Sequence, residues 1–289
     1  MKHHLSFALL FCVVLSGISA DAEVRYSGGA GTLQSPYLIS TRDDWIAIAG
    51  NIEDYSSYFE LTKNIEFPDG LTIEPIAGEG TGAVFQGVLD GRGFVLQYPT
   101  VDCRGEEFGG LFARVDGGTI KNLTLWDANI LNGECSGSLV GQLKGGLISK
   151  CEVWSTVKGK TQTGGVVGQC LESGVIYRAY ASCAVESETG YAGGIVGLCN
   201  IGWITTCRFR GTVEGEISGG VAGHMENSLC EDSWSNGTIS GRRAAGGLIG
   251  HATSLDDEPC IKNCYSSATV EKNCPPERWA DWSPGPVMK

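Results

Sequence analysis

Two histidines at matching positions of a repeated segment are the residues that most resemble metal ligands. His224 and His251 lie 27 residues apart, and the other two histidines, His3 and His4, fall in a leader sequence. A zinc site takes about four ligands, and no third or fourth ligand stands at a matching spacing. The sequence also lacks the H-E-x-x-H motif of zinc peptidases. We therefore interpret the two histidines as part of an outward polar row and predict no metal site.

Acidic side chains form the second group with catalytic chemistry, because two carboxylates can cleave a glycosidic bond. Adjacent carboxylates occur at Glu231 and Asp232 and at Asp256 and Asp257, the second pair within the insertion "HATSLDDEP". We predict no cofactor, with weak Ca²⁺ binding by such carboxylates as the alternative. No G-x-S-x-G motif is present. We expect no catalytic residues, and a carbohydrate-active enzyme of the polysaccharide lyase or glycosidase type remains the alternative.

One column of repeat positions is the strongest candidate for binding. The residues that stand four positions after an aliphatic residue in each copy are Thr124, Glu152, Tyr180, Arg208, Trp234 and Tyr265. Exposed aromatic rings can stack on sugar rings, while Glu152 and Arg208 offer hydrogen bonds. We predict a binding column of Tyr180, Trp234, Tyr265, Glu152 and Arg208. The alternative is that these are ordinary strand residues with high β propensity.

Cysteines recur at apolar positions of the repeat. The chain has 12 cysteines, of which Cys12 lies in the leader, so 11 remain and they cannot all pair internally. Cys170 and Cys199 occupy the same inward position of consecutive copies, where the expected separation suits a disulfide. We name this pair as the candidate disulfide, with buried thiols acting as small apolar spacers as the alternative.

A repeat of about 27 residues must position all of these side chains. Its copies begin at "GGLFA" (Gly109), "GSLVG" (Gly137), "GGVVG" (Gly164), "GGIVG" (Gly193), "GGVAG" (Gly219) and "GGLIG" (Gly246), with steps of 28, 27, 29, 26 and 27 residues. Each copy holds three short apolar segments separated by polar or glycine corners, and none is long enough for a helix. This pattern predicts an all-β, three-sided solenoid in which equivalent residues stack ~4.8 Å apart.

An inward row of side chains tests that prediction. The residue six positions after the first glycine of each copy is Val115, Leu143, Cys170, Cys199, Met225 or Ala252. All six are apolar, so we expect them to line the interior one above another. We expect glycines to mark corners, either because the backbone needs a positive φ there or because it approaches another segment closely.

The chain before the repeats differs. "STRDDWIAIAG" predicts a helix that starts after Thr41 and carries Asp43 and Asp44 in its first turn. Trp45, Ile46, Ile48 and Ala49 would form its apolar face. "YFELTKNIEF" and "VFQGVLDGRGFVL" read as strands. We interpret residues 23–108 as an N-terminal cap with degenerate first coils, which protects the end of the sheets from edge pairing.

These segments, together with "GGAGTLQSPYLISTRDDWIAIAGNI" and the six "GG-aliphatic-aliphatic-G" units, resemble the GLUG-motif proteins. These are secreted or surface β-solenoid proteins of bacteria, and the motif also occurs in the non-catalytic part of IgA1-specific metallopeptidases. The resemblance implies a right-handed parallel β-helix of the kind found in adhesins and large exoproteins. It implies no agreed biochemical activity and no catalytic residues.

The N-terminus and the charge indicate a location outside the cell. Residues 1–22 combine Lys2, an apolar run from Leu5 to Leu15 and small residues at Ala20 and Ala22, as secretory signal peptides do. That run is too short to span a bilayer, so we predict no membrane insertion. The net charge of −12 argues against nucleic acid as a partner.

We therefore predict a signal peptide at 1–22, a cap at 23–108, six coils at 109–273 and an irregular tail at 274–289. The predicted function is that of a secreted or cell-surface module, a monomer that binds an extracellular glycan or protein surface as adhesins do. A passive spacer within a larger exoprotein is a further alternative.

Overall fold

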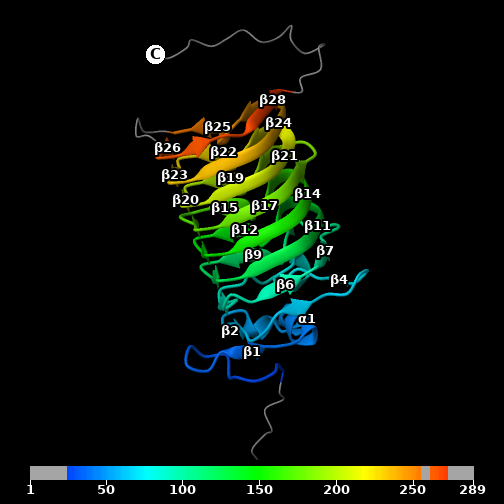
Figure 1. The fold of residues 1–289 in the computed structure, drawn as a ribbon. Helices are drawn as coiled ribbons and strands as arrows, with labels where there is room; N and C mark the ends of the chain where they lie inside the picture. The colour runs from blue at the N-terminus through cyan, green and yellow to red at the C-terminus, as the bar shows by residue number, and fades with distance from the viewer. Residues whose placement is uncertain (1–24, 255–260, 273–289) are drawn as a thin grey trace, which may run out of the picture.

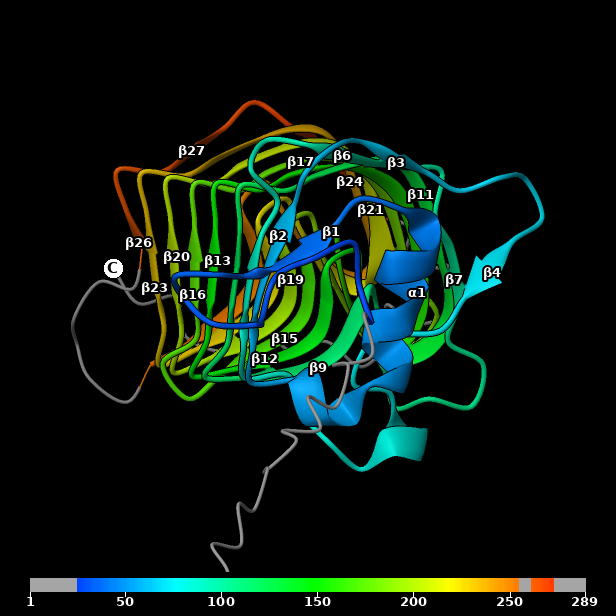
Figure 2. The ribbon, with the colours of Figure 1, turned by 90° about the horizontal axis from the view of Figure 1, so that it is seen from below.

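The computed structural model describes residues 25–254 and 261–272, and in it three parallel β-sheets wrap around one axis. Successive coils stack into a column that runs from the N-terminal helix to the last described strands (Figure 1). Seen along the axis, the coils superpose as a three-sided tube (Figure 2). The predicted all-β, three-sided solenoid with a short helix in its N-terminal cap is confirmed.

Three sheets, here called A, B and C, form the sides of the tube. Sheet A comprises β1 (Tyr37–Ile39), β2 (Tyr58–Leu61), β5 (Val88–Asp90), β10 (Thr119–Lys121), β13 (Leu147–Ser149), β16 (Val175–Tyr177), β20 (Trp203–Thr205), β23 (Leu229–Glu231) and β26 (Ile261–Lys262). Sheet C comprises β9 (Phe112–Asp116), β12 (Val140–Lys144), β15 (Val167–Leu171), β19 (Val196–Asn200), β22 (Ala222–Glu226) and β25 (Ile249–Thr253).

Sheet B contains the longest strands and curves around the tube (Figure 2). Its main path comprises β3 (Ile65–Glu66), β6 (Val95–Gln97), β11 (Thr124–Gly137), β14 (Glu152–Gly164), β17 (Tyr180–Ser187), β21 (Arg208–Gly219), β24 (Trp234–Gly246) and β27 (Tyr265–Ser266). Pairing beside that path are β4 (Thr72–Ile73), β7 (Thr100–Asp102), β8 (Phe108–Gly109), β18 (Tyr191–Gly193) and β28 (Thr269–Lys272). Strands β1 to β7 show that coil-like pairing already begins within residues 23–108.

Equivalent side chains stack one above another inside the tube. The predicted inward row pairs in register through sheet C, as Val115, Leu143, Cys170, Cys199, Met225 and Ala252. The first five are at most 1% exposed. Ala252 is exposed because no further described coil stacks on it. The register of the row is therefore confirmed, while the expected burial of Ala252 is wrong.

The corner between sheets A and B uses residues other than glycine in a left-handed conformation. One residue of each coil adopts φ of 50–58° there: Asn122, Lys150, Arg178, Thr206, Asp232 and Asn263. A side chain can occupy this conformation at a modest cost, most easily when it is Asn or Asp. The prediction that glycine would mark the corners is wrong for this one.

The motif glycines are instead required where backbones touch. A Cβ atom added to Gly193 would lie 1.9 Å from the carbonyl oxygen of Val196, and one added to Gly164 would lie 1.9 Å from that of Val167. One added to Gly168 would lie 2.6 Å from the carbonyl oxygen of Gly141, one coil away. Close approach, the second reason expected for glycine, therefore explains the motif.

The N-terminal end of the tube is closed by α1 (Arg42–Gly50), which follows Thr41 in a capping box with Asp44. Its Trp45 and Ile48 are 1% exposed. The Trp45 ring meets that of Phe112 at 6.2 Å, and Phe112 meets Phe85 at 4.8 Å. Aromatic rings thus fill the end of the bore. The expected apolar face of the helix is wrong for Ile46, which is 41% exposed. Two 3₁₀ turns follow, η1 (Ile52–Asp54) and η2 (Glu79–Thr81).

Within residues 25–254 and 261–272, no helix has the length and apolar character needed to cross a bilayer. The predicted signal peptide at 1–22, the tail at 274–289 and the pair Asp256 and Asp257 lie outside the described residues.

The glycine contacts predict a strong position effect on stability. We expect Gly193→Ala to lower the free energy of unfolding by about 1–3 kcal/mol or more, because the added methyl group must displace backbone atoms. The measurement is urea unfolding followed by circular dichroism. Gly80→Ala is the matched control, because nothing lies within 4 Å of a Cβ atom there. Equal stability of the two variants would contradict this account of the motif.

Candidate ligand-binding surface

The predicted binding column lies on the outer surface of sheet B. Its members pair in register across successive coils as Thr124, Glu152, Tyr180, Arg208, Trp234 and Tyr265. Tyr265 is 60% exposed, and its ring stacks on that of Trp234 with centroids 6.1 Å apart and an angle of 13°. The structure thus brings the five predicted residues onto one surface. Ligand binding by them stays a prediction.

Two tryptophans that the sequence reasoning missed extend this column. Trp126 and Trp154 stand two positions further along their strands, so they point to the same outer side. Their rings lie 5.0 Å apart, and Trp154 meets Tyr180 at 5.4 Å. We call the five residues Trp126, Trp154, Tyr180, Trp234 and Tyr265 the aromatic face. The alternation of outward residues along each strand was the signal that could have found the two tryptophans.

Two arginines divide the aromatic face. Arg208 and Arg210 are exposed on β21, between Tyr180 on one side and Trp234 on the other. No ion pair among the described residues involves either guanidinium group. Both groups can therefore donate hydrogen bonds to a ligand that lies on the rings.

A polar cleft continues the outer surface of sheet B beyond the aromatic face. It has a volume of about 360 Å³, and its lining includes Arg104, Asn132, Lys158, Glu186 and Glu188. Lys158 lies on the same strand as Trp154, and its Nζ is 2.9 Å from the Glu186 carboxylate. Asn132 donates a hydrogen bond of 2.8 Å to the carboxylate of Asp102. The outer surface of sheet B therefore combines ring surfaces with fixed hydrogen-bonding groups.

The two histidines lie side by side on the outer surface of sheet C. The Nδ1 atoms of His224 and His251 are 3.0 Å apart, and Tyr191 covers the other side of the His224 ring at 4.8 Å. Burial, and then the neighbouring His251, lower the pKa of His224 below its ordinary value. Among the described residues no group of three or more histidine, cysteine or acidic side chains is placed to hold a metal ion.

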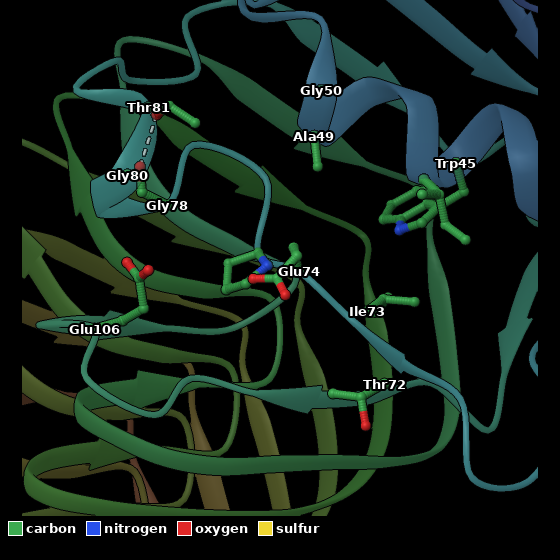
Figure 3. A pocket seen from close by; sticks show the side chains of 12 residues that line it. Trp45, Ala49, Gly50, Thr72, Ile73, Glu74, Gly78, Gly80, Thr81 and Glu106 are labelled. Atoms are coloured by element: carbon green, nitrogen blue, oxygen red, sulfur yellow. Dashed lines mark hydrogen bonds between the residues drawn. The ribbon is translucent and has the colours of Figure 1, made fainter.

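The N-terminal cap carries a second hollow, shown in Figure 3. This cleft of about 430 Å³ lies between α1 and the segment that follows β4, and apolar parts of Trp45, Ile46 and Ile73 line it. The carboxylates of Glu74 and Glu106 stand at its side (Figure 3). Glu106 accepts a hydrogen bond of 2.6 Å from the backbone N–H of Glu79, which fixes one of its oxygens.

The candidate catalytic and disulfide residues are placed as follows. Asp232 lies at the corner between sheets A and B with φ of 50°, and its neighbour Glu231 is the last residue of β23. Cys170 and Cys199 are register partners in the interior and are free thiols. A disulfide between them stays a prediction.

Comparisons with known proteins support the fold. No protein-family profile matches the chain. It is 32% identical over 204 residues to Halomucin of Haloquadratum walsbyi (strain DSM 16790 / HBSQ001), a match that covers 58% of this chain and 2% of Halomucin. The chain therefore spans only a small part of that relative. The crystal structure of a proposed immunoglobulin A1 protease from Bacteroides ovatus has the same fold, with a TM-score of 0.69 and 20% identity, over 86% of this chain and 80% of that one.

The histidine pair predicts a pH dependence of stability. Because the pKa of His224 in the folded protein lies below 6.5, the unfolded chain takes up the proton more readily as the pH falls through that value. The stabilisation is therefore complete above about pH 7 and is lost below it. We expect the thermal midpoint to fall between about pH 7.5 and pH 5.5, before most carboxylates titrate.

The variant His224→Gln should flatten this dependence, while Gln142→Asn, a change in the same outward row, should preserve it. The measurement is thermal unfolding at both pH values. An unchanged pH dependence in His224→Gln would show that the pair does not titrate in this range.

Proposed function

We propose that this chain is a secreted or cell-surface β-solenoid module that binds glycans on the outer surface of sheet B and performs no catalysis. The observation that carries the proposal is the aromatic face, where rings from five coils gather on one side of the tube. Large rings on an outer sheet surface can receive the apolar faces of sugar rings.

Polar groups beside the rings supply what stacking alone lacks. Arg208 and Glu152 stand in the same column as Tyr180, and both are exposed. The polar cleft places Lys158 and Asn132 further along the same outer surface. Sugar hydroxyls need donors and acceptors at fixed positions, and the ion pair between Lys158 and Glu186 holds both kinds.

The comparisons support a location outside the cell. Immunoglobulin A1 is a secreted protein, so a proposed protease of it with this fold would work in that setting. The name Halomucin likewise points to mucins, which are extracellular glycoproteins. The net charge of −12 agrees with a partner other than nucleic acid.

Removal of two rings should weaken glycan retention. We expect Trp234→Ala combined with Tyr180→Ala to reduce affinity about tenfold or more, because stacking on two rings is lost. The measurement is a glycan-array screen of the protein with and without Ca²⁺, followed by titration of the best ligand. Trp203→Ala is the control, because this tryptophan is 55% exposed on sheet A.

The same experiment separates the alternative functions. A module that binds a protein surface would retain no glycan, and an affected protein partner would then have to be sought for the aromatic face. A carbohydrate-active enzyme would turn over a bound glycan and lose that turnover when Asp232, Asp256 or Asp257 is replaced by Asn. A passive spacer would show neither retention nor turnover, and that result would overturn the proposal.

A further inference from the structure

One pair of cysteines near the end of the described solenoid differs from all the others. Among the nine described cysteines, eight are buried and only Cys264 is half-buried. Its sulfur lies 3.6 Å from the Sγ of Cys230, which belongs to the preceding coil. A disulfide needs the two sulfurs at about 2.05 Å, so roughly 1.5 Å of approach would join them.

Comparison with equivalent positions shows that the environment of Cys264 is unusual. Cys151, Cys207 and Cys264 occupy the same position of three coils. Burial raises the pKa of Cys151 and of Cys207 to about 12, so these thiols are inert. For Cys264, the hydrogen bond from the Cys230 thiol lowers the pKa to about 7. The backbone N–H of Ser233 also donates to its sulfur, at 3.4 Å.

The reason for the difference is the position along the axis. Cys207 is covered by a further coil, whereas Cys264 lies on the last described coil. There Ile261 is 38% exposed and Val270 is 46% exposed. Solvent and small reagents therefore reach the Cys264 sulfur, while Cys230 lies directly beneath it as a buried partner.

We propose that Cys230 and Cys264 form a reactive dithiol that exchanges with small-molecule disulfides and closes into a bond between the last two coils. In the first step the Cys264 thiolate attacks a disulfide RS–SR, forms Cys264–S–SR and releases one thiolate RS⁻. In the second step the Cys230 sulfur loses its proton, attacks the Cys264 sulfur and releases the second RS⁻. The two cysteines are oxidised by two electrons, and RS–SR is reduced to two thiols.

The bond would fasten the terminal coil to its neighbour. Strands β26, β27 and β28 pair with β23 and β24 on one side only within the described chain. A covalent link between Cys230 on β23 and Cys264 beside β27 limits separation of these strands. The redox state of the pair would then determine how readily the terminal coil opens.

A tryptic map tests the proposal without ambiguity. Cleavage after Lys and Arg leaves Cys230 as the single cysteine of peptide 211–242 and Cys264 as the single cysteine of peptide 263–272. The reduced full-length protein is incubated with oxidised glutathione, the remaining thiols are alkylated, and the peptides are identified by mass spectrometry. We expect peptides 211–242 and 263–272 to be linked, and Cys264 to react first.

Two variants separate the steps. In Cys230→Ser, Cys264 should stop at the mixed disulfide with glutathione, because the resolving thiol is gone. In Cys264→Ser, Cys230 should remain reduced. Hydrogen exchange supplies a second readout, since oxidation should slow exchange of the amides in residues 261–272 about tenfold or more in the parent protein. Cys170→Ser is the control for general loss of packing.

Other outcomes would overturn the proposal. Linkage of peptide 263–272 to peptide 244–262 or 273–278, which carry Cys260 and Cys274, would assign Cys264 a different partner. A reaction of Cys264 no faster than that of buried Cys170 would show that its sulfur is not reactive. Failure of Cys230→Ser to accumulate the mixed disulfide would refute the resolving role of Cys230.

Discussion

The structure depends on direct contact between the backbones of successive coils. Parallel hydrogen bonding sets the distance between neighbouring strands at ~4.8 Å, and no side chain fits where one main chain crosses another at that distance. At the last glycine of the motif, a Cβ atom on Gly197 would lie 2.8 Å from the carbonyl oxygen of Gly168, and one on Gly223 would lie 2.8 Å from that of Gly197. The motif therefore repeats because the same contact recurs in every coil.

This stacking has opposite consequences inside and outside the tube. Inside, each position must hold a side chain that fits between two copies of itself, which small apolar groups such as the thiols of Cys170 and Cys199 do well. Outside, the same register turns a single aromatic position into a continuous column, because a ring on one coil lies within contact of the ring on the next, as Trp234 and Tyr265 show. A solenoid thus builds an extended surface from one choice per coil, and that surface can change along the axis, as it does at Arg208.

The sequence predicted what depends on the period, and it failed where one coil differs from another. The register of the inward row and of the binding column followed from counting residues, since each step adds one coil. Trp126 and Trp154 were missed because only one outward position per coil was compared, although strand alternation makes the second position equally exposed. The corner between sheets A and B was misjudged because residues such as Arg178 adopt the left-handed conformation there at φ of 54°, and residue type alone does not show this. The exposure of Ala252 depends on what stacks beyond it, which no count within the repeat reveals.

The two ends of the described solenoid show why position along the axis governs chemistry more than the motif does. At the N-terminal end, α1 and a chain of aromatic rings through Trp45, Phe112 and Phe85 exclude water from the bore. At the other described end the last coil has a neighbour on one side only. Cys207 and Cys264 are equivalent in the repeat, yet the pKa of Cys207 is raised to about 12 by burial while that of Cys264 is lowered to about 7 by the hydrogen bond from Cys230. Burial by the next coil is therefore what keeps an interior thiol unreactive, and the same residue type becomes a nucleophile where that cover is incomplete.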